Sequence, residues 1–284
     1  DGQEDRMTLL NNWEATYFDF NEDKLVELMG DAVKLGVDMF LLDDGWFGNK
    51  YERHSDTQGL GDWDETQHKL PHGIQKLIDE AAKRNIKFGI WIEPEMVSPK
   101  SELYEKHKDW VIHLPNRDEY YFRNQMVLDL SNPEVQDFVF GVVDGLMTKY
   151  PGIAYFKWDC NSPITNIYSP YLKDKQTHLY VDYVRGLYKV LDRIKAKYPK
   201  LPMMLCSGGR LRGIAVLHRV LGQRQHRPHT TPVHPIRLLV LLSGQVHERP
   251  RDHMEQEREH QIPHGRGHDG QARFRHQAQR HERR

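Results

Sequence analysis

The chain lacks any run of eighteen consecutive apolar residues, so no membrane-spanning helix is expected. It also lacks a charge excess: its formal net charge is −1, which argues against a nucleic acid or a membrane surface as a partner. Residues 1–5 are acidic and polar, unlike a signal peptide, and resemble the interior of a longer protein.

Cysteine is scarce, with two in 284 residues. Cys160 and Cys206 each stand at the end of a strand-like run, where they suit packing or a pocket better than a disulfide framework. Two such thiols favour a reducing compartment, so a cytoplasmic location is expected.

The last part of the chain lacks residue types that are common before it. Residues 210–284 contain no Lys, Tyr, Trp or Asn, yet they hold eleven of the 17 histidines and many Arg and Gln. A disordered basic tail and a metal-binding or nucleic-acid-binding arm are two interpretations. The histidines show no ligand spacing, and Phe274 is the one aromatic residue of the segment, so neither interpretation accounts well for it.

Residues 1–209, in contrast, alternate strand-like and helix-like runs. The predicted strands are Thr8–Asn12, Val37–Asp44, Lys87–Glu93, Met126–Asp129, Ala154–Asn161 and Pro202–Cys206. The predicted helices are Glu22–Lys34, Ile74–Arg84, Pro99–His107, Pro133–Tyr150 and His178–Tyr198. This alternation predicts an α/β fold, an incomplete (β/α)₈ barrel of the TIM type with about six recognisable β/α units and its last strands lost.

The predicted strand 154–161 carries the most informative polar residues. Lys157, Asp159 and Asn161 alternate at its carboxyl end, so they face one side. Charged groups at the carboxyl end of a buried parallel strand are typical of a barrel active site. The alternative is a buried Lys–Asp pair that ties the strand to a helix.

Six motifs occur in order along the first 209 residues. They are NNWEATYFD at 11–19, LDDGWFG at 42–48, GDW at 61–63, GIWIEPEM at 89–96, KWDCN at 157–161 and CSGG at 206–209. Together they resemble the catalytic barrel of glycoside hydrolase family 36, the bacterial-type α-galactosidases.

The resemblance implies that Asp159 is the catalytic nucleophile of a retaining mechanism, which needs a second carboxyl group about 5–5.5 Å away as acid and base. Lys157 places positive charge on the same face and favours the ionised form of Asp159. In the family this lysine also contacts the sugar, and Asn161 can hydrogen-bond a sugar hydroxyl.

The resemblance also assigns substrate-binding residues. Asp43 and Asp44 bind the sugar's 4- and 6-hydroxyls, although adjacent acids in isolation would suggest a solvated loop or a helix cap. The other expected substrate contacts are Trp13, Trp46 and Trp91 through their flat faces, Arg123, and the loop that begins with Cys206, Gly208 and Gly209. Glu93 and Glu95 are structural in the family and are not assigned as acid or base.

The family pattern breaks after residue 209. Members continue toward a strand that ends Phe-Trp-Ala-Ser-Asp-Asn-Thr-Asp, in which the Asp after Ser is the general acid/base. Back-translation of residues 215–228 with suitable codons, shifted by one base, encodes this segment. We therefore interpret residues 210–284 as an out-of-frame translation, in which the acid/base codon straddles those of Arg224 and Gln225.

The sequence thus predicts a barrel of a retaining α-galactosidase that hydrolyses terminal α-linked galactose in melibiose- or raffinose-type oligosaccharides, inactive as written. The resemblance implies no metal and no other cofactor, and its full-length members are expected to form homo-oligomers. Two alternatives are an α-N-acetylgalactosaminidase or galactosyltransferase of a related barrel. Another, of a different class, is a catalytically dead sugar-binding barrel.

Overall fold

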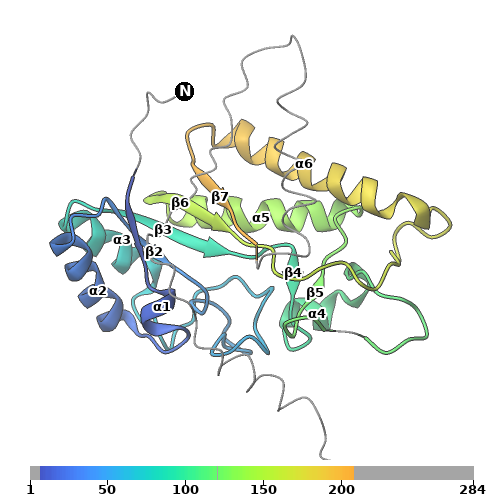
Figure 1. Cartoon of the computed structure of the whole chain (residues 1–284), viewed down its shortest axis with the longest axis horizontal. Coiled ribbons are helices and arrows are strands. Elements are labelled where there is room, and N and C mark those ends of the chain that lie inside the picture. The colour runs from blue at the N-terminus through green and yellow to red at the C-terminus, as the bar shows by residue number, and fades with distance from the viewer. Residues whose placement is uncertain (1–6, 120, 208–284) are drawn as a thin grey trace, which may run out of the picture. The chain divides into compact units, whose positions relative to one another are not determined.

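The computed structural model describes residues 7–119 and 121–207, whose ribbon Figure 1 shows. The main sheet has five strands: β1 (Leu9–Asn11), β2 (Met39–Leu42), β3 (Lys87–Ile92), β6 (Ile153–Trp158) and β7 (Met203–Leu205). The strands lie side by side in that order, and each pairs in parallel with the next. All five carboxyl ends therefore meet at one edge.

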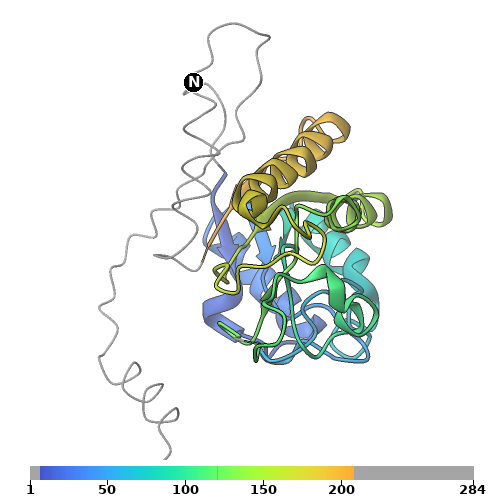
Figure 2. The ribbon, with the colours of Figure 1, turned by 90° about the vertical axis from the view of Figure 1, so that its right-hand side faces the viewer.

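Helices connect the parallel strands, as parallel pairing requires. They are α1 (Trp13–Thr16), α2 (Glu22–Lys34), α3 (Gly73–Lys83), α4 (Glu102–Lys106), α5 (Pro133–Lys149) and α6 (Leu179–Lys197), with 3₁₀ turns η1 (Lys108–Trp110) and η2 (Gln176–His178). Figures 1 and 2 show α5 and α6 side by side. None of the helices in the described part of the chain is both long and apolar enough to span a membrane.

Local sequence signals decide where these helices begin. The Asn21 side chain accepts a hydrogen bond from the Lys24 amide at the start of α2, and Asn132 does the same for Glu134 in α5. Pro133 occupies the first turn of α5, where its missing amide hydrogen leaves no partner unsatisfied. The expected helix 99–107 shortens to α4 because Ser101 caps it at the amide of Tyr104.

One predicted strand of the barrel is wrong. The run 126–129 contributes only β5 (Met126–Val127), which pairs antiparallel with β4 (Met96–Val97) in a separate two-stranded sheet. Strand β3 pairs directly with β6, so the main sheet of the described residues has five strands, not six. The run is short, buried and apolar, and such a run does not specify which strand it pairs with.

The sheet packs a different apolar cluster on each face. On one face, side chains that include Phe40, Ile90 and Phe156 join the large core formed with the helices. On the other, Met39, Leu41 and Tyr155 form a small separate cluster. A Cβ at Gly89 would lie 2.8 Å from Leu41 Cδ1, so this second face is closely packed. A parallel sheet buried on both faces is what barrel walls contain.

The expected division into a barrel of residues 1–209 and an out-of-frame segment 210–284 has its boundary outside the described residues. It stays a prediction from the sequence.

Helix α6 passes very close to the segment that follows β5. A Cβ at Gly186 would lie 1.8 Å from the carbonyl oxygen of Leu130. Gln136 Nε2 donates to the same oxygen at 2.8 Å. One residue earlier, the fully buried Asp129 accepts hydrogen bonds from the Ser131 and Ser169 hydroxyls. Glycine is therefore required at position 186 by a backbone approach rather than by its conformation.

We expect Gly186→Ala to lower the free energy of unfolding by about 1–3 kcal/mol, because the added methyl group forces α6 away from Leu130. Intrinsic helix propensity alone would change stability by up to about 1 kcal/mol in the opposite direction. Urea unfolding of the full chain, followed by tryptophan fluorescence, measures the difference.

Gly145→Ala in α5 is the matched control, since a Cβ there meets nothing within 4 Å. It should leave stability unchanged or raise it. Equal stabilisation by both substitutions would show that α6 and Leu130 are not in close contact.

Candidate active site

Each strand of the main sheet is followed at once by a polar or ionisable residue. In strand order they are Asn12, Asp43, Glu93, Asp159 and Cys206. Neighbouring strands are in register close to these ends: Trp91 pairs with Lys157, and Trp158 with Leu205. The five side chains therefore share the edge at which parallel α/β barrels place their chemistry.

Four hydrogen bonds hold Asp43: its carboxylate accepts three, and its backbone amide donates one. Its Oδ2 accepts from Lys157 Nζ and from Asn11 Nδ2, both at 2.6 Å. Its Oδ1 accepts from the Asp44 amide at 2.9 Å, and its own amide donates to Asn12 Oδ1 at 2.7 Å. The carboxylate is 3% exposed, so these partners replace the water it has lost.

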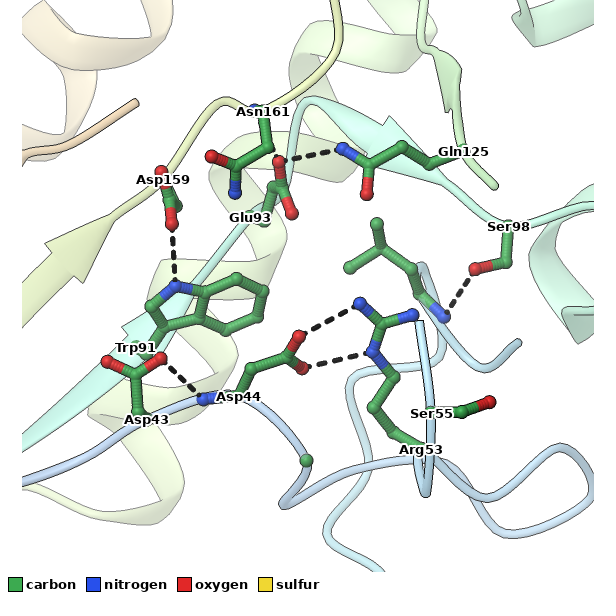
Figure 3. A network of polar contacts seen from close by, with 12 residues as sticks. Asp43, Asp44, Arg53, Ser55, Trp91, Glu93, Ser98, Gln125, Asp159 and Asn161 are labelled. Atoms are coloured by element: carbon green, nitrogen blue, oxygen red, sulfur yellow. Dashed lines mark hydrogen bonds and ion pairs between the residues drawn. The ribbon is translucent and has the colours of Figure 1, made fainter. Parts of the chain in front are cut away.

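Asp44 forms a bidentate ion pair with Arg53 (Figure 3). Arg53 Nε donates to Oδ1 at 3.0 Å and Nη2 donates to Oδ2 at 2.9 Å. Burial raises the pKa of Asp44 in spite of this pair, and the nearby charges of Asp43 and Asp159 add to the rise. Arg53 therefore provides the main opposing influence that favours the ionised carboxylate.

Asp159 accepts hydrogen bonds at both oxygens. Trp91 Nε1 donates to Oδ2 at 3.1 Å, and the Cys160 amide donates to Oδ1 at 3.0 Å. The expected positive neighbour, Lys157, pairs directly with Asp43 instead. Burial lowers the pKa of Lys157, but Asp43 and Asp159 outweigh this effect and raise it overall, so the ammonium stays charged.

Glu93 is a buried carboxyl group among other acids. Its Oε1 accepts from Gln125 Nε2 at 2.9 Å and from the Asn161 amide at 2.5 Å. Burial raises the pKa of Glu93 to about 8, and the charge of Asp159 contributes. Glu93 is therefore largely neutral at pH 7. The hydrogen bond from Asn161 to Glu93 comes from its backbone amide, not from its side chain.

Glu95, also buried, serves the fold. Its two oxygens accept from Trp158 Nε1 at 2.9 Å and from the Tyr183 hydroxyl at 2.6 Å, so it ties β6 to α6. This geometry suits the structural role expected for it.

The three candidate tryptophans differ in what they can contact. Trp13 is half-buried and packs edge-on against Phe18 at 5.1 Å between ring centroids. Trp91 is 2% exposed and donates to Asp159. Trp46 is fully buried and donates to the Trp91 carbonyl at 2.9 Å. Trp46 therefore has no exposed face on which a sugar could stack, and it instead holds the backbone of Trp91.

The remaining candidates lie at the margin of the network. Arg123 is exposed on a turn with φ of 54°, and among the described residues the network's hydrogen bonds reach Gln125 rather than Arg123. Burial, with the charge of Asp159, raises the pKa of the Cys206 thiol to about 11, so the thiol is protonated. Gly208 and Gly209 lie outside the described residues.

Sequence analysis missed Arg53 and Gln125 as parts of the site. Neither belongs to the six motifs, and each reaches the strand ends from a loop. Asn11 and Asn12 did stand in a motif, and their position at the end of a predicted strand was the available signal. Among residues 7–119 and 121–207, no group of three or more His, Cys, Asp or Glu side chains is arranged to hold a metal ion.

A cavity of about 590 Å³ lies apart from these residues. It is lined by residues 61–65 and by side chains of α4, η1 and α5, and none of the strand-end residues lines it. The chemical site is thus identified by its polar network rather than by this cavity.

Known proteins with similar sequences indicate the family of this chain. The family model named Melibiase matches residues 2–233. The chain is 45% identical to alpha-galactosidase AgaA of Geobacillus stearothermophilus over 206 residues, which are 72% of this chain and 28% of that enzyme. It is 44% identical to alpha-galactosidase Mel36A of Lactobacillus acidophilus over 205 residues, with the same shares of each chain.

Solved structures agree. The crystal structure of the GH36 alpha-galactosidase AgaA gives a TM-score of 0.68 and covers 72% of this chain and 28% of that one. An alpha-galactosidase from Lactobacillus brevis, 43% identical, gives 0.69, with 72% and 27% covered. The chain thus spans little more than a quarter of the length of these relatives. By the extent of the family match and the identity to its relatives, the chain belongs to the melibiase family, glycoside hydrolase family 36.

Proposed function

We propose that the strand-end site is the galactose-binding and nucleophile half of a retaining α-galactosidase site. The observation that carries this proposal is the position of Asp159 at the end of β6, at the same sheet edge as Asp43 and Asp44 at the end of β2, in a chain whose relatives are α-galactosidases. Variants of AgaA have been solved with stachyose and with raffinose. We infer that α-galactoside oligosaccharides are the substrates here too.

The proposed chemistry is a double displacement. An Asp159 oxygen attacks the anomeric carbon, the bond to the leaving oxygen breaks, and a second carboxylic acid protonates that oxygen. The same group then takes a proton from water, which attacks the anomeric carbon and releases Asp159. Hydrogen bonds from Trp91 and Cys160 hold Asp159 in place for the attack.

Substrate hydroxyls are assigned to the acids of β2. We infer that Asp43 and Asp44 accept hydrogen bonds from the 4- and 6-hydroxyls, with Lys157 at the same hydroxyl edge of the sugar. Charged acceptors that lose their partner are costly to bury, so they reject a sugar whose 4-hydroxyl points elsewhere. Trp13, at the start of α1, and Trp91, which donates to Asp159, are the aromatic side chains that we assign to the sugar. Asn161 and Cys206 flank Asp159 in sequence or strand order.

The second carboxyl group is proposed to be absent from this chain as written. Its codon, in the shifted frame, straddles those of Arg224 and Gln225. The abrupt change in composition at about residue 210 supports an out-of-frame segment from there. We infer that the chain alone is inactive on natural substrates.

An α-N-acetylgalactosaminidase or a galactosyltransferase of a related barrel would use the same nucleophile and differ near Cys206. A sugar-binding barrel without catalysis would keep the site and lack the burst described next. No described residue favours these alternatives over an α-galactosidase.

The full chain should not turn over raffinose, because leaving-group protonation needs the second acid. An aryl α-galactoside with a good leaving group should instead give one slow burst of phenol, with one galactosyl group added to the protein by mass spectrometry.

Asp159→Ala should abolish that burst, and Asp137→Ala, an exposed acid of α5 paired with Arg193, is the control. Steady raffinose turnover by the unmodified chain would refute the proposed inactivity.

Sequencing the source DNA on both strands across the codons for residues 206–213 tests the frame. An inserted or deleted base in these codons should restore the family's acid/base segment. A confirmed reading as written would instead establish the His- and Arg-rich segment as a translated part of the protein.

Glu93 should make stability depend on pH. The folded pKa of about 8 exceeds the ordinary 4.5, so the native state binds the proton more tightly than the unfolded chain. Its contribution is fully present below pH 4.5 and is lost as pH rises to 8, with a slope of up to about 1.4 kcal/mol per pH unit.

Glu93→Gln keeps the acceptor for Gln125 and removes the titration, so unfolding free energies measured from pH 5 to 8 should fall less steeply. Glu80→Gln on α3, whose pKa is lowered by Lys83, Arg84 and Lys76 to about 2, should leave this slope unchanged. An unchanged slope in Glu93→Gln would mean that Glu93 is ionised throughout the range.

A further inference from the structure

Arg53 is the most deeply buried cation of the site, at 2% exposure, and it does not come from a strand end. It lies in the loop after β2, nine positions beyond Asp44. Nε and Nη2 both donate to Asp44, and Nη1 donates to the Gln58 carbonyl oxygen at 3.0 Å. Each nitrogen of the guanidinium thus has an acceptor.

Two aromatic rings confine the guanidinium. Its central carbon lies 5.5 Å from the centroid of Phe18 and 5.9 Å from that of Phe47. Contacts of this kind add to the ion pair and restrict how the planar group can turn. Arg53 therefore presents its fork to Asp44 in one orientation.

The loop backbone is also fixed. The buried Lys69 ammonium donates to the carbonyl oxygens of Gly45 and Arg53, at 2.8 and 2.9 Å. Gly48 and Gly59 have φ of 84° and 83°, and a Cβ on either would lie within 2.5 Å of the Tyr51 carbonyl oxygen. The loop has this course because glycine stands at both places.

The consequence falls on Asp44. Both of its oxygens accept from one rigid fork, so the carboxylate cannot rotate to follow a hydroxyl in another direction. Asp43, in contrast, is held by three separate groups, Asn11 and Lys157 at Oδ2 and the Asp44 amide at Oδ1. Asp44 is thus the acid whose direction depends on one partner.

We propose that Arg53 is a positioning residue for sugar specificity: by holding both oxygens of Asp44 it fixes the direction in which Asp44 accepts hydrogen bonds, and so makes the site prefer galactose over its C4 epimer, glucose. This inference rests on the proposed function, because it takes Asp44 as a ligand of sugar hydroxyls. Arg53 itself does not need to touch the sugar.

Charge gives a second readout. The ionisable groups that act electrostatically on Asp44 are Arg53, Asp43, Asp159, Glu93 and Lys69. Burial and the neighbouring acids raise the pKa of Asp44, and Arg53 opposes them. Removing the arginine should therefore move the acid limit of galactose binding to higher pH.

The test is binding of D-galactose, D-glucose and 6-deoxy-D-galactose to the full chain, followed by tryptophan fluorescence from pH 5 to 8. Arg53→Lys keeps the charge but loses the fork, so the preference for galactose over glucose should fall by about tenfold or more with a small pH effect. Arg53→Met should lose the preference and also shift the pH limit. The matched control is Arg193→Met, since Arg193 pairs with Asp137 and lies 4.2 Å over Phe140, on α6 and α5.

A double-mutant cycle separates positioning from general stability. If Arg53 acts through Asp44, Arg53→Met should change the galactose-to-glucose ratio in the native background and leave it unchanged in an Asp44→Asn background. The Asp44→Asn/Arg53→Met pair removes both charges of the ion pair and so creates no new unpaired buried charge, which keeps it measurable if Arg53→Met alone unfolds.

Wild-type binding with an unchanged preference in Arg53→Lys would overturn the role of Arg53 and leave the proposed function standing. Failure of the wild-type chain to bind galactose would overturn both.

Discussion

Four carboxyl groups lie buried at one edge of a parallel sheet, and the site depends on how their charges are balanced. Asp43, Asp44, Glu93 and Asp159 are each under a tenth exposed. Like charges this close cannot all ionise without compensation. The negative charge of each acid is balanced in a different way, by a cation, by neutral hydrogen-bond donors or by a retained proton.

Two of the acids have cations. Lys157 pairs with Asp43 across the sheet, and Arg53 pairs with Asp44 from a loop. Asp159 has neutral donors instead, an indole and a backbone amide, which leave it free to form a bond to carbon in the proposed mechanism. Glu93 is compensated by keeping its proton, as its pKa of about 8 shows. A neutral Glu93 spares the neighbouring Asp159 one more negative charge.

The supporting shell is as specific as the acids. The Trp46 indole N–H donates to the backbone carbonyl of Trp91, whose own indole N–H donates to Asp159, so two buried tryptophans help to fix where the proposed nucleophile lies. Lys69 holds the loop that carries Arg53. These contacts join β2, β3 and β6 with the loop after β2, so the site exists only when the sheet and that loop are both formed.

The amino-acid sequence determined much of this protein. Alternating runs predicted four of the long helices with bounds correct to within one residue. They also predicted the existence of the five strands of the main sheet, with less accurate bounds. Both succeed because apolar periodicity and caps such as Asn132 act locally. Polar residues at the end of the predicted strand 154–161 indicated a barrel active site around Asp159, whereas Asp43 and Asp44 were assigned only through the resemblance to the family. The six motifs also indicated the family, which the family model and the relatives confirm, and the expected roles of the motif residues came from that resemblance.

The tertiary structure alone decided the rest. Whether residues 126–127 join the main sheet, which acid Lys157 pairs with, and whether Trp46 has an exposed face all depend on contacts between segments far apart in the chain. Arg53 and Gln125 carry no local signal, because their role arises only where their loops meet the strand ends. The periodicity of a sequence predicts which face of a helix or strand a residue occupies. Which residue it contacts across the fold is decided by tertiary packing and by the balance of buried charges.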